Sequence, residues 1–199
     1  WLWKTMGIRG VQFAKANKLP PEFVADLLNT LYLKTVRPPV FVGDYPMADA
    51  RLLKNWIDSV QYHLPTAVRS AVDIRLLDYP LQQALQRVCD STPQFDVREL
   101  FTSGMVNAQA INPFSTVTFA RPFADTAIAK PINRNPLLAY AYLLTNNQVG
   151  LPVIHYQDYF DWKPDIDRLL ALHKAYIYQA STVYYLNAEE ASYFADYAS

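Results

Sequence analysis

The residue types best suited to ligand binding lie in the last quarter of the chain, just after a short apolar run. They are aromatic: Tyr156, Tyr159, Phe160 and Trp162. The faces of aromatic rings stack on the apolar faces of sugar rings, and the same rings also fill protein cores. The cluster therefore predicts either a carbohydrate-binding platform or local packing, and the sequence leaves both open.

Metal, disulfide and nucleotide chemistry have few residues to use. Asp161, Asp165 and Asp167 could hold calcium, but they flank a predicted helix start, where carboxylates offset the positive end of the helix dipole. Cys89 has no second cysteine for a disulfide, and the three histidines show no zinc-ligand spacing. The five glycines form neither a dinucleotide-binding fingerprint nor a Walker loop. We therefore expect no metal site and no cofactor.

The overall charge argues against polyanionic partners. The 199 residues include 18 basic and 18 acidic side chains, for a net charge of zero, so no chain-wide field attracts a nucleic acid or an anionic membrane. The longest apolar runs are shorter than the roughly 20 residues of a membrane-spanning helix. With 51% apolar residues, the chain can build a packed core. We expect a globular fold with no nucleic-acid partner and no membrane span.

Five apolar runs, each followed by a stretch with helical spacing, give the chain a strand–helix rhythm. The runs cover residues 10–14, 40–42, 72–77, 116–120 and 151–156. The helical stretches cover residues 20–31, 50–60, 81–88, 136–145 and 166–178. Apolar strands separated by helices indicate a buried parallel sheet, so the predicted fold class is α/β. Five strands cannot close an eight-stranded barrel, so the sheet is either doubly wound and complete or part of a barrel.

Several segments resemble, in order, the second half of the catalytic barrel of the α-amylase family of glycoside hydrolases (family 13). Residues 8–18 are similar to the fourth-strand motif G-F-R-x-D-A-x-K-H, and residues 40–45 are similar to the fifth-strand segment that ends in Gly-Glu. Residues 77–81 are similar to the sixth-strand motif D-[FY]-P-L, and residues 112–119 precede the position of the seventh-strand motif. Residues 135–142 and 150–159 are similar to helix seven and the eighth strand. Five such segments in family order and spacing are more specific than any one of them.

This resemblance implies a partial TIM (β/α)8 barrel, strands four to eight, over residues 1–180. Residues 183–186 and 192–195 alternate as in a β-hairpin, so residues 181–199 are expected to form a hairpin that leads a trailing β domain. The first three barrel strands are then expected from a missing N-terminal part or from a partner chain. The resemblance favours an extracellular or cell-surface protein, whereas the sequence itself leaves localisation unknown.

The resemblance also indicates which catalytic groups this chain has lost. Retaining glycoside hydrolysis uses a nucleophilic carboxylate and an acid about 5–5.5 Å apart. Aligned from Gly10, the family's nucleophilic Asp falls on Ala14, and the Arg that keeps it ionised falls on Gln12. The Lys-His pair that contacts substrate falls on Asn17 and Lys18. A methyl group cannot form the covalent glycosyl intermediate, so we expect a catalytically silent relative.

Two carboxylates remain as candidates for the other catalytic positions. The family's acid/base Glu falls on Asp44, and Asp125 is a candidate for the third carboxylate, although the segment is one residue longer than the motif. Both also have an alternative role, which is to satisfy backbone groups at strand ends. The expected substrate-binding residues, by resemblance and by position after the strands, are Gln12, Lys18, Tyr45, Tyr156 and Tyr159.

The sequence therefore leaves competing functional hypotheses. The first is a non-catalytic module that binds an α-glucan, another oligosaccharide or a partner protein. The second is an active α-glucan hydrolase or transglycosylase with a rearranged site, in which Asp44, Asp125 or Asp158 takes part in a single displacement. The third is an unrelated α/β domain whose segments match by coincidence.

Overall fold

The computed structural model describes residues 5–7, 10–34, 40–91, 96–123, 127–178, 180, 182–185 and 195–198. Five parallel strands form one sheet: β1 (Gly10–Phe13), β2 (Val40–Gly43), β3 (Asp73–Leu77), β4 (Thr116–Phe119) and β5 (Leu151–Val153). Their order in the sheet is their order in the chain. A doubly wound sheet reverses its strand order partway, whereas a barrel does not. The sequential order is therefore compatible with a partial barrel.

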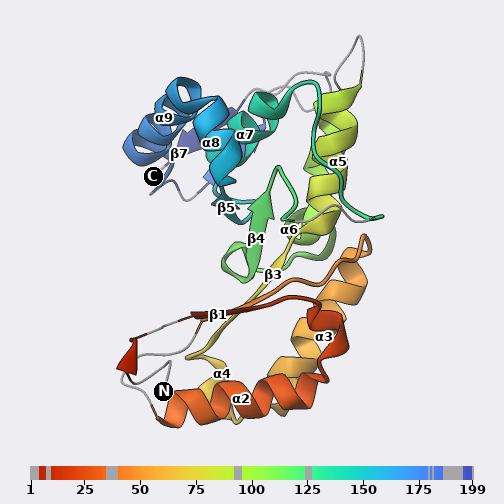
Figure 1. Cartoon of the computed structure of the whole chain (residues 1–199), viewed down its shortest axis with the longest axis vertical. Coiled ribbons are helices and arrows are strands. Elements are labelled where there is room, and N and C mark those ends of the chain that lie inside the picture. Colours follow the sequence, from red (N-terminus) through yellow and green to blue (C-terminus); the bar gives the residue numbers. More distant parts are fainter. Residues whose placement is uncertain are drawn as a thin grey trace.

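Each crossover between strands contains a helix. The long helices are α2 (Pro21–Leu33), α3 (Ala50–His63), α5 (Tyr79–Asp90), α7 (Pro136–Leu144) and α9 (Lys163–Leu172). Figure 1 shows the strands crossing the middle of the molecule, with α2, α3 and α4 (Thr66–Arg69) at one end and α7, α8 (Tyr156–Asp161) and α9 at the other. The remaining short elements are α6 (Gly104–Gln109), the 3-10 helices η1 (Ala16–Lys18), η2 (Val97–Phe101) and η3 (Pro113–Ser115), and the π-helical turn η4 (His173–Ile177).

Local sequence signals set several helix starts. Pro21 is the first residue of α2, where its missing N–H costs nothing. The Asp49 carboxylate accepts hydrogen bonds from the backbone N–H groups of Arg51 and Leu52, and so caps α3. Asp78 caps α5 in the same way, through the backbone N–H of Leu81. These caps explain why the predicted helices begin close to where the structure has them.

The end of β5 corrects one prediction. The apolar run over residues 151–156 predicts a six-residue strand, but β5 ends at Val153 and Tyr156 already begins α8. The His155 side chain accepts a hydrogen bond from the backbone N–H of Gln157, which caps α8. His155 therefore serves as a helix cap rather than as part of a longer strand.

The core has two parts on the helix side of the sheet. One lies where α2 and α3 meet the first three strands, and includes Phe41, Leu53, Trp56, Ile57 and Leu76. The other lies among α5, α7 and α9, and includes Leu85, Ala120, Tyr140, Leu143 and Ile166. Parallel sheets need cover on both faces, and these helices supply it on one.

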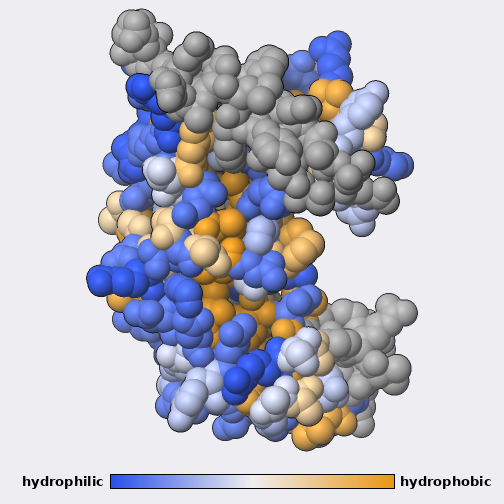
Figure 2. Space-filling model, turned by 180° about the vertical axis from the view of Figure 1, so that it is seen from behind, coloured by the Kyte–Doolittle hydropathy of each residue, from blue (hydrophilic) through white to orange (hydrophobic). Residues whose placement is uncertain are grey.

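A third cluster lies on the opposite face of the sheet, which we call the inner face. It contains Leu77, Tyr79, Val117, Phe119 and Ala129, with Val42, Ile128 and Val153 packed against it. Figure 2 shows hydrophobic residues gathered in the middle of the face that it displays. Burial falls off toward β1: all four residues of β4 are buried, whereas Gly10 and Gln12 are exposed.

The sheet does not close on itself. Among the described residues, β1 pairs only with β2, and β5 pairs only with β4, so each leaves one edge free. Strand β6 (Thr182–Tyr185) pairs antiparallel with β7 (Ala195–Ala198) in a separate sheet. The domain division at residue 180 and the trailing β domain stay predictions. No helix in the described part of the chain is long and apolar enough to span a membrane.

Candidate functional site

The carboxyl ends of parallel strands meet at one edge of a sheet, where barrel proteins build their sites. Ala14 directly follows β1, and Asp44 directly follows β2. The register pairs Phe13 with Gly43, so Ala14 and Asp44 come next on adjacent strands. The backbone N–H of Asp44 donates to the Phe13 carbonyl at 2.9 Å, and the N–H of Ala16 donates to the Asp44 carbonyl at 2.7 Å. These bonds hold the two positions side by side.

Strand alternation decides which face these side chains share. Phe13 stacks on Phe41 with ring centroids 5.3 Å apart, and both belong to the helix-side core. Gln12 lies opposite Val42, which packs on the inner face. Since side chains alternate along a strand, Gln12 lies on the inner side, and Ala14 is the first residue after the end of β1. The position beside Asp44 therefore carries a methyl group, with no carboxylate.

Tyr79 holds the Asp44 carboxylate. Its phenol oxygen donates to Asp44 Oδ1 at 2.6 Å. Burial raises the pKa of the Tyr79 phenol, and the neighbouring Asp44 carboxylate raises it further, so Tyr79 remains a donor. Asp44 is half-buried, and no hydrogen bond to its Oδ2 comes from the described part of the chain. One carboxylate oxygen is therefore fixed, and the other has no hydrogen-bond partner among the described residues.

Aromatic rings form a row along the carboxyl ends of β3, β4 and β5. We call this the aromatic row; it consists of Tyr79, Phe119, Phe123, His155 and Tyr156. Successive ring centroids lie 5.2, 6.2, 6.5 and 5.0 Å apart. Tyr79 and Phe119 are buried, whereas Phe123 is 47% and Tyr156 is 69% exposed. The row thus runs from the Asp44 contact to an exposed aromatic surface.

A buried ion pair fixes the segments that carry the exposed end of the row. Arg121 donates through Nε to Asp158 Oδ1 at 2.6 Å, and Tyr140 Oη donates to Asp158 Oδ2 at 2.6 Å. Hydrogen bonding to Asp158 raises the pKa of Arg121, and burial raises the pKa of the Tyr140 phenol. Both carboxylate oxygens of Asp158 are therefore occupied. Arg121 precedes Phe123 and Asp158 lies in α8, so this pair joins the β4 loop to α8.

Asp78 also directly follows a strand, β3, but its carboxyl group binds backbone N–H groups and is buried. It is 1% exposed, and accepts hydrogen bonds from the backbone N–H groups of Leu81 at 2.9 Å and Met105 at 2.8 Å. Burial raises the pKa of Asp78 to about 6, although the two backbone bonds oppose this shift. The carboxyl group joins the starts of α5 and α6 and is not exposed to a ligand.

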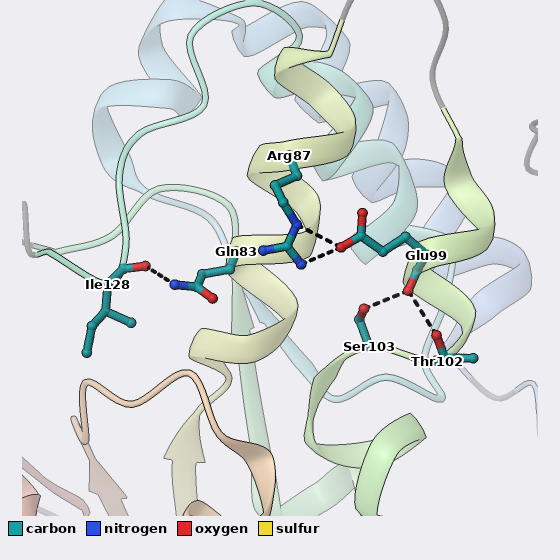
Figure 3. Close-up of polar contacts among 6 residues, drawn as sticks. All are labelled: Gln83, Arg87, Glu99, Thr102, Ser103 and Ile128. Carbon is teal, nitrogen blue, oxygen red and sulfur yellow. Dashed lines mark hydrogen bonds and ion pairs between the residues drawn. The ribbon is translucent and has the colours of Figure 1, made fainter.

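Polar contacts from α5 hold two neighbouring segments in place (Figure 3). Gln83 Nε2 donates to the Ile128 carbonyl at 2.7 Å, which ties the segment after β4 to α5. Arg87 forms an ion pair with Glu99, whose own carbonyl accepts from Ser103 Oγ at 2.6 Å. The loops beside the carboxyl edge are therefore positioned from the same helix.

The other predicted site residues lie in different surroundings. Tyr45 packs edge-on against Trp56 with centroids 6.2 Å apart, beside the helix-side core. Tyr159 Oη donates to Asp167 at 3.0 Å, and Lys163 Nζ lies 5.0 Å from the Tyr159 ring centroid. Lys18 is exposed at the end of η1. Asp125 lies outside the described residues.

Sequence reasoning brought together Gln12, Ala14 and Asp44 but missed their neighbours. Tyr79 lies in the D-Y-P-L segment, where a phenol directly after a strand end is the available signal. Phe123 and Arg121 lie in the segment where the motif did not align, and no local pattern singled them out. Within the described ranges, no group of three or more His, Cys, Asp or Glu side chains could hold a metal ion.

The chain is similar in sequence to a known protein. That protein is an alpha-amylase. This relative comes from Geobacillus stearothermophilus. It is 28% identical to the chain over 191 residues, and the match covers 89% of this chain and 32% of the relative. The chain therefore spans about a third of the length of that alpha-amylase. No family model matches the chain. Together with the sequential parallel sheet, the similarity supports an α-amylase-like, barrel-related α/β protein.

Proposed function

We propose that this chain belongs to an α-amylase-like protein that binds an oligosaccharide at the carboxyl edge of its sheet without hydrolysing it. The observation that carries the proposal is the methyl group of Ala14 beside Asp44. Retaining hydrolysis requires a second carboxylate about 5–5.5 Å from the acid, in order to attack the sugar. Alanine supplies no such group, and Gln12 supplies no positive charge to support one.

The single-displacement alternative meets a second obstacle. It requires a carboxylate that activates water at roughly 6.5–9.5 Å from the acid. Asp158 was one candidate, but both of its oxygens accept hydrogen bonds from Arg121 and Tyr140. The Asp158 side chain is also only 2% exposed, so the water that it would have to activate has little access to it. This argues against a rearranged hydrolase that uses Asp158.

Binding is supported by the groups that remain. Asp44 Oδ2 can accept a hydrogen bond from a sugar hydroxyl while Tyr79 holds Oδ1. The exposed rings of Phe123 and Tyr156 offer stacking faces for the apolar face of a sugar ring. An α-glucan is the ligand that the alpha-amylase similarity favours.

We also propose that further strands complete the sheet. The free edges of β1 and β5, together with the partial coverage of the relative, support the addition of barrel strands from another part of the protein or from a partner chain. In that arrangement the inner face would be enclosed, as in an eight-stranded barrel.

Titration of the full-length protein with maltotriose, by calorimetry, tests the proposal. We expect binding without release of shorter sugars, and a roughly tenfold weaker affinity in Tyr156→Ala. Tyr62→Ala is the matched control, because Tyr62 is 79% exposed on α3, away from the site. Turnover of maltotriose that disappears in Asp44→Ala would overturn the proposal.

A further inference from the structure

A cavity lies at the amino ends of strands β4 and β5, opposite to the carboxyl ends that carry the candidate site. Its volume is about 500 Å³, within the range of small-molecule pockets. Its described lining residues are Pro113, Phe114, Asn147, Gln148, Gly150, Leu151, Pro152, His173, Tyr178 and Ala180. Leu151 begins β5, and Pro113 and Phe114 belong to η3, which directly precedes β4. The cavity is therefore at the amino ends of these strands, separate from Asp44 and the aromatic row.

The walls of this cavity are fixed before any ligand arrives. Asn147 Nδ2 donates to the carbonyls of Ile177, at 2.9 Å, and Ala180, which ties the turn before β5 to the end of η4. Gly150 has φ +134°, and a Cβ there would lie 2.9 Å from Thr118 Cγ2. The turn that carries Asn147 and Gly150 thus packs directly on β4. A preformed cavity loses little conformational entropy when a ligand binds.

The lining defines the charge of the ligand. None of the described lining residues is Asp, Glu, Lys or Arg, so no counter-charge is available for an ionic ligand. Burying an unpaired charge in such a cavity is costly. The lining therefore favours a neutral ligand.

The lining also defines the shape and polarity of the ligand. Phe114 is 67% and Tyr178 is 71% exposed, and Tyr178 is held by an edge contact with the His173 ring at 6.4 Å. His173 Nδ1 lies 2.8 Å from the Leu144 carbonyl. Because a carbonyl only accepts, the Nδ1–H group donates to it, which leaves Nε2 as the ring nitrogen without a hydrogen bond to a described residue. Two largely exposed aromatic rings beside the His173 imidazole and the Gln148 amide suit a ligand ring with apolar faces and a hydroxyl-bearing edge.

We propose that this cavity is a second, independent binding site for a neutral pyranose, with Phe114 and Tyr178 as its stacking residues. The ligand class is argued from the lining alone and does not depend on the site at the carboxyl edge. The two sites lie at opposite ends of the strands, so one oligosaccharide-binding chain can hold two sugar segments at once.

Hydroxyl-radical footprinting of the full-length protein with and without maltotriose tests this proposal. We expect the sugar to protect Phe114 and Tyr178 at least twofold, with Tyr62 unchanged as the exposed control. Tyr178→Ala should weaken the corresponding affinity at least tenfold, while Tyr156→Ala should leave the protection of Phe114 intact. Both substituted rings are largely exposed, so neither change should prevent folding.

The outcomes separate the two sites. Protection of Phe114 and Tyr178 without protection of Tyr156 supports this second site and overturns the proposed function at the carboxyl edge. Protection of Tyr156 alone overturns the second site and leaves the proposed function standing. Protection of none of these residues at saturating maltotriose overturns both. A Phe114→Ala variant with unchanged protection at Tyr178 and unchanged affinity would also contradict the stacking role.

Discussion

We predict that removing Arg121 destabilises the fold more than removing the charge of Asp158, although both changes break the same ion pair. The Asp158 side chain is 2% exposed and the Arg121 side chain is 29% exposed. Arg121→Met would leave the buried carboxylate with Tyr140 as its remaining side-chain partner from the described residues. Asp158→Asn would instead leave a guanidinium that water can partly rehydrate. The two substitutions break the same pair but leave charges in different surroundings.

The magnitudes follow from that difference. Removing one partner of a buried pair costs about 3–5 kcal/mol, because the remaining charge is uncompensated. We expect Arg121→Met to lie near the upper end, at about 4–5 kcal/mol, and Asp158→Asn near about 3 kcal/mol. Part of the Asp158→Asn cost comes from Tyr140, whose hydrogen bond to a charged acceptor becomes a bond to a neutral one. The double variant should lose less than the sum of the two.

Urea unfolding of the full-length protein measures these costs, provided that the m-value is unchanged. Lys54→Met is the matched control. Its ion pair with Asp58 has a similar length, 2.5 Å, but lies on the exposed face of α3, where we expect at most about 0.5 kcal/mol. Equal losses of unfolding free energy in Arg121→Met and Asp158→Asn, or additive losses in the double variant, would refute the explanation that the cost comes from a buried charge without its partner.

Three further predictions concern single positions. The pKa of Asp78 is raised from 3.8 to about 6, so between these values the folded state keeps a proton that the unfolded state has lost. The contribution of Asp78 to the free energy of unfolding should therefore fall by about 2 kcal/mol as pH rises from 4 to 7, and Asp78→Asn should flatten that dependence in unfolding measured at several pH values. Gly150→Ala should lower the free energy of unfolding by at least about 2 kcal/mol, because its Cβ would lie 2.9–3.1 Å from atoms of β4. Gly10→Ala is the control: the nearest atom would lie 3.5 Å from its Cβ, so the same assay should show almost no change. Tyr79→Phe should weaken maltotriose binding several-fold by releasing Asp44 from its fixed orientation, and calorimetry that shows no change in affinity would contradict that role.

The alternation of strands and helices could be read from the sequence because its signals are local. Apolar runs bounded by proline or aspartate mark strands and helix caps within a few residues of each other. Pro21 and Asp49 illustrate this, since each lies within one turn of the helix that it starts. The end of β5 was harder to read, because it depends on the His155 side chain turning back to Gln157 instead of continuing an apolar run.

The candidate site was predictable only where chain order alone brings residues together. Ala14 and Asp44 each follow consecutive parallel strands, so their adjacency follows from the register. The bond from Tyr79 to Asp44 joins residues 35 positions apart, and that from Arg121 to Asp158 joins residues 37 positions apart. No local pattern in the sequence encodes such pairs. These pairs form because the loops after different strands lie together at the carboxyl ends of the sheet.

The contacts of three carboxylates explain why we propose binding without hydrolysis. Asp78 follows β3, but is buried and caps α5. Asp158 follows β5, but both of its oxygens are occupied. Asp44 follows β2 and has one oxygen without a partner from the described residues, yet its neighbour at the end of β1 is Ala14. Hydrolysis of a glycosidic bond needs two carboxyl groups acting together, whereas a hydrogen bond to a sugar hydroxyl needs only one. Among these three described carboxylates, Asp44 alone has an oxygen without a hydrogen-bond partner from the described residues, and this is the observation behind the proposal of binding without hydrolysis.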